Sequence, residues 1–231
     1  MKKAEHTGPE RISFRSFGIS VLQELNLEKG IGFTIKEMTL RPGKAIREYL
    51  FEDRSKYTKP LTLLLLVVAV ATFISLQILP LNEELSDAVE NDPNLNIFPE
   101  ALQPTLRALP ELLNKYFNIF FMSSIPALAF STYFLFKEFK YNLAEHLVVN
   151  IYIFSIQTVI FMIFMPLFPF WEWTVYIHLA LLIGYSIFAY TKVFEQNWGP
   201  GILKSALVYL MSQFFLSVFI AILLLVLLVV N

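Results

Sequence analysis

The stretch PLTLLLLVVAVATFISLQILPL, residues 60–81, runs for 22 residues without a charged side chain. At about 1.5 Å of rise per residue, a helix of this length crosses a hydrocarbon core of roughly 30 Å. Comparable uncharged runs follow at residues 117–136, 147–170, 173–191 and 205–230. We therefore predict an all-α polytopic membrane bundle with five transmembrane helices.

The composition of the 231-residue chain excludes several other classes of protein. Hydrophobic residues make up 56% of the chain and charged residues 16%, whereas soluble domains have about a quarter charged residues. The apolar residues are gathered into five blocks that make up about half of the chain, which excludes a basic nucleic-acid-binding domain, so we expect no nucleic-acid partner. The absence of cysteine excludes a disulfide framework, a thiolate zinc site and an iron–sulfur cluster. We expect no cofactor.

The distribution of charge indicates the orientation in the membrane. Residues 82–116 contain seven carboxylates and only two basic residues, whereas six basic residues crowd the segment just before the first run. These six are Arg41, Lys44, Arg47, Arg54, Lys56 and Lys59. The positive-inside rule therefore places the N-terminus in the cytoplasm, and five crossings place the C-terminus outside.

The chain divides into two parts on this pattern. Residues 1–59 form a cytoplasmic segment in which apolar residues recur at helical spacing, which predicts short amphipathic interfacial helices. Residues 60–231 form the transmembrane domain, with an outer acidic loop and an amphipathic helix at 82–116. The six basic residues could contact either anionic lipid headgroups or a protein partner, and the sequence leaves both open.

Uncharged polar residues inside the runs are the candidate functional residues, because no Asp, Glu, Lys or Arg lies there. Spacings of four, four and seven put Asn142, His146, Asn150 and Gln157 on one stripe of the third run, and Gln157, Tyr185 and Gln213 fall at a similar depth. Two interpretations remain. The residues either form interhelical hydrogen bonds worth about 0.6 kcal/mol each or line a cavity that opens to the cytoplasm and holds a lipid headgroup.

Glu145 and His146 are an adjacent acid and imidazole at the start of the third run, but adjacent helical positions point about 100° apart. We therefore expect neither a metal site nor catalysis there. Glu145 is expected to pair with Lys140 or with the basic helices, and His146 to hydrogen-bond at the headgroup boundary. Gly199-Pro200-Gly201 predicts a turn.

Two segments, LRPGKAIREYLFEDRSKYTKPLTLLLL and KYNLAEHLVVNIYIF, together resemble a bacterial family of membrane proteins of unknown function. The residues that carry the resemblance are Pro42, Gly43, Ile46, Tyr49, Arg54, Tyr57, Pro60, Tyr141, Glu145, His146, Leu147 and Val148. The resemblance implies the inner membrane of a bacterium. Many relatives carry a four-cysteine zinc ribbon, which these 231 residues lack. A fainter likeness to Yip-type trafficking proteins concerns architecture alone.

The function expected from these observations is that of a non-enzymatic accessory or scaffold protein. Its partners would be membrane lipids, and other membrane subunits or a second copy of the chain. The alternative is a transporter or flippase for a lipid or another amphiphile, acting as an oligomer. A lipid-modifying enzyme that uses Glu145 and His146 is disfavoured, because no second carboxylate, metal set or nucleophile accompanies them.

Overall fold

The computed structural model describes residues 30–78, 117–171 and 173–230, with isolated positions between 96 and 107. All the regular structure in these residues is helical, which confirms the predicted all-α class. The elements are α2 (Ile31–Leu40), α3 (Pro42–Phe51), η1 (Arg54–Lys56), α4 (Pro60–Ile78), α7 (Phe117–Leu135), η3 (Lys137–Phe139), α8 (Leu143–Phe164), η4 (Met165–Leu167), α9 (Trp173–Val193) and α10 (Trp198–Val230). Residues 1–29 and most of the predicted acidic loop and helix at 82–116 lie outside the described residues.

Four helical segments of the described chain are long and apolar enough to cross a membrane. They are Arg54–Ser75, Leu143–Leu167, Trp173–Val193 and Trp198–Phe219. A shorter apolar helix, Met122–Leu135, belongs to α7. The chain is therefore an integral membrane protein.

Local sequence shifts two helix starts from their predicted positions. α8 begins before residue 147 because the Asn142 side chain accepts a hydrogen bond from the Glu145 amide at 2.9 Å, and the Glu145 carboxylate accepts one from the Asn142 amide at 2.7 Å. α10 begins at Trp198. The predicted turn at residues 199–201 is wrong. These residues form the first turn of α10, where Pro200 is tolerated because the first amides of a helix have no intrahelical partner.

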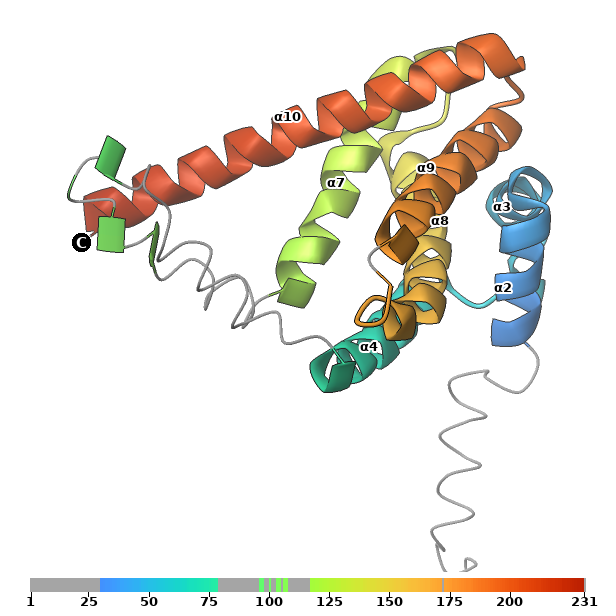
Figure 1. The fold of residues 1–231 in the computed structure, drawn as a ribbon. Helices are drawn as coiled ribbons and strands as arrows, with labels where there is room; N and C mark the ends of the chain where they lie inside the picture. The colour runs from blue at the N-terminus through green and yellow to red at the C-terminus, as the bar shows by residue number, and fades with distance from the viewer. Residues whose placement is uncertain are drawn as a thin grey trace, which may run out of the picture.

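The helices are arranged around α8, which packs against α4, α7 and α9. Figure 1 shows α2 and α3 side by side next to α8 and α9, and α10 crossing α7 and extending past the other helices toward its C-terminal end. The N-terminal helices thus lie against the bundle.

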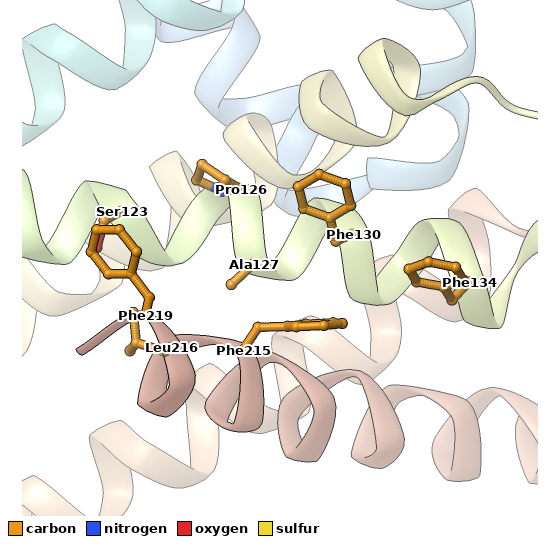
Figure 2. A pocket seen from close by; sticks show the side chains of 8 residues that line it. All are labelled: Ser123, Pro126, Ala127, Phe130, Phe134, Phe215, Leu216 and Phe219. Carbon is orange, nitrogen blue, oxygen red and sulfur yellow. The ribbon is translucent and has the colours of Figure 1, made fainter. Parts of the chain in front are cut away.

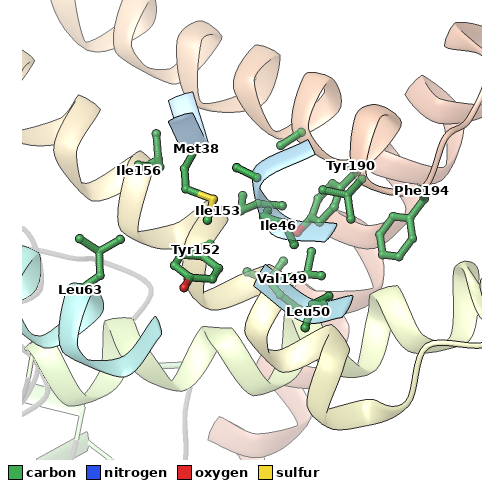
Figure 3. Packing of buried hydrophobic residues seen from close by; sticks show 14 of the residues in the cluster. Met38, Ile46, Leu50, Leu63, Val149, Tyr152, Ile153, Ile156, Tyr190 and Phe194 are labelled. Atoms are coloured by element: carbon green, nitrogen blue, oxygen red, sulfur yellow. The ribbon is translucent and has the colours of Figure 1, made fainter. Parts of the chain in front are cut away.

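The largest buried cluster joins the two predicted parts of the chain. Met38 and Ile46 from the N-terminal segment are fully buried and pack with Leu63, Tyr152 and Ile156 of the transmembrane helices (Figure 3). The buried residues of α2 and α3 face α8 and α9, because the protein itself offers an apolar surface there. Phe33, Leu40 and Phe51 of these helices stay exposed, and the expected interfacial position of α2 and α3 stays a prediction.

Candidate intramembrane ligand site

The contact between α3 and α9 depends on a glycine. A Cβ atom at Gly43 would lie 2.3 Å from the carbonyl oxygen of Lys192, so only glycine allows the two backbones this close. Pro42 occupies the first turn of α3, where its missing amide hydrogen costs nothing, and Ile46 is fully buried one turn later. These three motif residues therefore have packing roles.

Arg47 ties the same two helices together. Its Nη1 donates to the carbonyl oxygens of Lys192 at 2.6 Å and Val193 at 3.1 Å, and its Nη2 lies 3.2 Å from Glu195 Oε1. The last carbonyls of a helix lack intrahelical donors and carry partial negative charge. Arg47 therefore caps the C-terminal end of α9.

Arg54 also serves a helix end. Its guanidinium donates to the carbonyl oxygens of Tyr49 at 3.2 Å and Leu50 at 3.3 Å, and lies 5.8 Å from the centre of the Tyr49 ring. The Tyr49 ring in turn meets Tyr152 of α8 edge to face at 5.2 Å. Arg54 thus stabilises the end of α3 at the place where it reaches α8.

Lys56 and Tyr57 both bind Glu48. The Lys56 ammonium donates to Glu48 Oε1 at 2.5 Å and the Tyr57 hydroxyl to Oε2 at 2.9 Å. These two bonds, the one from Lys56 first, hold the pKa of the Glu48 carboxyl below its ordinary range. Three of the six predicted headgroup contacts, Arg47, Arg54 and Lys56, bind other groups of the chain. Arg54 and Lys56 are nevertheless exposed in part. The other three, Arg41, Lys44 and Lys59, are exposed.

The second motif segment meets the first. The Tyr141 ring lies 5.2 Å from that of Phe51 and 5.6 Å from that of Phe194. The expected pairing of Glu145 with Lys140 or the basic helices is wrong, because the Glu145 carboxylate is part of the α8 cap. The expected headgroup bond of His146 is wrong as well. His146 is fully buried among aromatic rings, and neither ring nitrogen has a partner among the described residues.

The polar side chains in the first half of α8 are engaged within the chain and line neither of the two cavities described below. Asn150 Nδ2 donates to Thr132 Oγ1 at 2.9 Å and to the carbonyl oxygen of His146 at 2.8 Å, and Asn150 Oδ1 accepts from the Tyr190 hydroxyl at 2.7 Å. Asn142 is the cap of α8. The predicted cavity along Asn142, His146 and Asn150 is therefore corrected, since these side chains are taken up by the cap, the aromatic cluster and the interhelical bonds.

Gln157 forms hydrogen bonds with polar side chains of two other helices, but not with Tyr185 or Gln213, which were predicted to lie at the same depth in the membrane. Its Nε2 donates to Ser186 Oγ at 2.6 Å and to the Tyr209 hydroxyl at 3.0 Å. Tyr185, one residue before Ser186, points to the other side of α9 and donates to the Met38 carbonyl oxygen at 2.9 Å. The prediction was wrong because equal depth does not specify which face of α9 looks toward Gln157.

Gln157 and Gln213 do share a cavity. It has a volume of about 480 Å³ and lies between α7, α8, α9 and α10. Its walls are mainly apolar, and none of the lining residues in the described part of the chain is charged. The polar lining residues are Ser124, Gln157, His178, Tyr209, Ser212 and Gln213.

His178 is the residue of this cavity that sequence reasoning missed. Its side chain is 6% exposed, and its Nε2 has no hydrogen-bond partner among the described residues. Tyr209 and Ser212, which share a face of α10 with the predicted Gln213, were missed as well. Their spacing of three and four puts them on one side of α10, and this pattern is a signal that could have been read from the sequence.

A second cavity of about 590 Å³ lies between α7 and α10. Figure 2 shows Phe130 and Phe134 from α7 facing Phe215 and Phe219 from α10 across this space. Leu216 lines both cavities. The second cavity has almost no polar surface, so it offers a ligand nothing that would orient a head group.

The cavity of about 480 Å³ is suited to binding a small molecule and not a metal ion. Among the described residues no group of three or more His, Cys, Asp or Glu side chains could hold a metal ion. The 480 Å³ cavity has the size and the mainly apolar lining of a small-molecule site, with a few polar groups that could orient a ligand. We define it as the candidate pocket.

Comparison with known proteins gives one family match. The profile of a protein family of unknown function, DUF3667, matches residues 28–72, which include α2, α3 and most of α4. No curated protein and no solved structure matches the chain. The match agrees with the expected resemblance to a family of unknown function.

Proposed function

We propose that this chain is a non-enzymatic membrane protein that binds one amphiphile within the bilayer, in the candidate pocket. The observation that carries the proposal is the cavity of about 480 Å³, whose described lining residues form mainly apolar walls with several polar groups and no charge. Pockets of about 300–1,000 Å³ with few polar groups are typical small-molecule sites. In this protein the pocket is enclosed by helices that cross the membrane, so its ligand would come from the lipid phase.

The proposed topology has five crossings with the N-terminus in the cytoplasm. α7 contributes the fifth crossing, since its 19 residues span about 28 Å. The proposed location is the inner membrane of a bacterium. Because the chain has no cysteine, single cysteines introduced as Glu52→Cys and Asn94→Cys report orientation cleanly. We expect a membrane-impermeant thiol reagent to label position 94 in intact cells and position 52 only after permeabilisation. The reverse pattern would contradict the topology.

Ligand binding is tested by what copurifies with the protein. Native mass spectrometry of the full chain in mild detergent should show one bound amphiphile. Ser212→Trp places a bulky side chain inside the pocket, whereas Leu210→Trp adds the same side chain to an exposed position of the same helix. We expect the first variant to lose the bound species and the second to keep it. Equal retention, or no bound species in the wild type, would refute the proposal.

Binding is favoured over transport by what lies between the pocket and the cytoplasmic end of the bundle. There Asn150 bonds to Thr132 and Tyr190 at 2.9 and 2.7 Å, and these residues are buried. A transported amphiphile would have to break this layer. A dithionite-quenching assay with fluorescent lipids in proteoliposomes distinguishes the two roles, because only a flippase makes the inner-leaflet lipid accessible.

The accessory role also involves a partner at the cytoplasmic face. Arg41, Lys44 and Lys59 are exposed there, and each would contribute about 1 kcal/mol against an anionic lipid surface. We propose that this face contacts lipid headgroups and other membrane subunits. Affinity purification from membranes compares the wild type with a variant in which all three residues are Gln. An unchanged set of bound proteins and lipids would contradict this part of the proposal.

A further inference from the structure

His178 is a buried polar group whose side chain lines the candidate pocket. It lies in the second turn of α9, and its ring is 5.4 Å from that of Phe161 and 5.5 Å from that of Phe168. The Nε2 atom is buried and has no hydrogen-bond partner among the described residues. A buried polar atom without a partner is costly, and native structures provide partners for the great majority. A ligand group in the pocket would provide this one.

The other buried histidine, His146, also has unpartnered ring nitrogens among the described residues, but it does not line the pocket. Both nitrogens of His146 also lack partners among the described residues. However, His146 packs against Tyr133, Tyr141 and Phe194, and it lines neither cavity described above. Of these two histidines, only His178 combines a nitrogen that has no partner among the described residues with a place in the wall of one of the two cavities.

The chemistry of the pocket lining restricts the head group of the ligand. Since none of the described residues that line the pocket is charged, a phosphate, carboxylate or ammonium group would be buried there without a counter-ion from them, at a high desolvation cost. A neutral imidazole nitrogen either donates or accepts a hydrogen bond, and the Gln213 amide on the facing helix α10 offers both. A hydroxyl, which also donates and accepts, complements both groups.

We propose that the pocket selects a long-chain amphiphile with an uncharged, hydroxyl-bearing head group, and that His178 Nε2 forms its hydrogen bond. The inference rests on the proposed function, because it specifies the ligand of the same pocket. His178 lies five residues after the start of α9, about 8 Å along the helix. The head group therefore lies toward the Trp173 end, and the chain of the ligand runs inward along Leu182 and Phe154.

Photoaffinity labelling of the purified full chain tests this selection. Three diazirine probes of equal chain length are used, which end in a hydroxyl, a carboxylate or a methyl group. We expect the alcohol to label residues of the pocket about tenfold more than the hydrocarbon or the fatty acid, the change that one hydrogen bond to a buried group produces. This comparison uses only the wild type, so it does not depend on whether a variant folds.

Two variants assign the selection to His178. His178→Phe keeps an aromatic ring among Phe161 and Phe168 but removes the nitrogens, so labelling by the alcohol should fall to the level of the hydrocarbon. Tyr176→Phe is the matched control, since Tyr176 lies on the same helix with 73% of its surface exposed. Labelling of this control should equal that of the wild type.

The outcomes separate this inference from the proposed function. Equal labelling of the pocket by all three probes, stronger labelling by the fatty acid, or unchanged labelling of His178→Phe by the alcohol would overturn the inference and leave amphiphile binding intact. Labelling of no pocket residue by any probe would overturn the proposed function, and the inference with it.

Discussion

The part of the bundle near α3 and the candidate pocket use similar polar residues in opposite ways. Around α3 and the start of α8, Arg47, Asn150 and Tyr190 are bonded to other parts of the chain. In the pocket, His178 is a lining residue whose Nε2 lacks a partner within the described residues. Buried polarity alone therefore does not indicate a site. The informative residues are those whose hydrogen-bonding capacity is left open beside a cavity.

The segment that matches the family of unknown function lies in the first of these two regions. The matched segment, residues 28–72, contains Gly43, Arg54 and Tyr57, all of which hold α3 in place or end it. The pocket is built by α7, α8, α9 and α10, outside that segment. The recognisable motif thus belongs to the region that we interpret as structural.

The largest effect is expected at the closest helix contact of the structural region. Gly43→Ala should destabilise the protein by about 1–3 kcal/mol, because the new Cβ meets backbone atoms of Lys192 that cannot move aside. Denaturant titration in detergent micelles measures this. In the control Gly32→Ala no atom lies within 4 Å of the new Cβ, so its stability should be unchanged or slightly raised. Similar effects of both variants would show that α3 is not held against α9.

Removal of the Arg47 cap is the next test. Arg47→Met keeps much of the apolar stem but leaves the carbonyls of Lys192 and Val193 without their charged donor, so we expect a loss of about 1.5–3 kcal/mol. Lys44→Met, at an exposed position one turn earlier on α3, should change the unfolding free energy by less than about 0.5 kcal/mol. If the two variants were equally stable, Arg47 would be free to serve as a headgroup contact.

A pair of substitutions contrasts the two regions directly. Tyr190→Phe removes the hydroxyl that donates a hydrogen bond to Asn150 Oδ1. We expect a loss of stability of about 0.6 kcal/mol, the average for hydrogen bonds between membrane helices, with a maximum near 1.7 kcal/mol. A double-mutant cycle with Asn150→Leu isolates the value. His178→Phe removes the Nε2 atom, which has no hydrogen-bond partner among the described residues, so stability without ligand should stay level or rise. Destabilisation of His178→Phe in ligand-free protein would mean that its nitrogens are already satisfied.

The smallest effect concerns pH. The bond from Lys56, and after it the bond from Tyr57, lowers the pKa of Glu48 in the folded protein. The contribution of the ionised Glu48 carboxylate to the stability of the folded protein is therefore complete above the ordinary glutamate pKa of about 4.3. It is lost as the pH falls through the lowered pKa. Hydrogen exchange of α3 should increase as the pH falls through this window, after correction for intrinsic rates. Glu48→Gln should show a flatter profile, and an identical profile would contradict the assignment.

Much of the fold could be predicted from the sequence, but less of the site. The start of α4 at Pro60 and of α9 at Trp173 match the predicted runs, because long uncharged stretches have no stable place except the membrane. The partners of Gln157 could not be predicted in the same way. Depth along a helix follows from residue count, whereas the rotation of one helix against another depends on side-chain packing.

The sequence by itself determined that this is a helical membrane protein with few ionised groups inside its spans, since both facts depend only on residue type and run length. The tertiary structure alone decided that α2 and α3 pack into the bundle, that Asn150 is satisfied and that His178 lines a cavity. Each of these depends on which faces of distant helices meet. That choice comes from close contacts such as the one between Gly43 and Lys192, which no local pattern encodes.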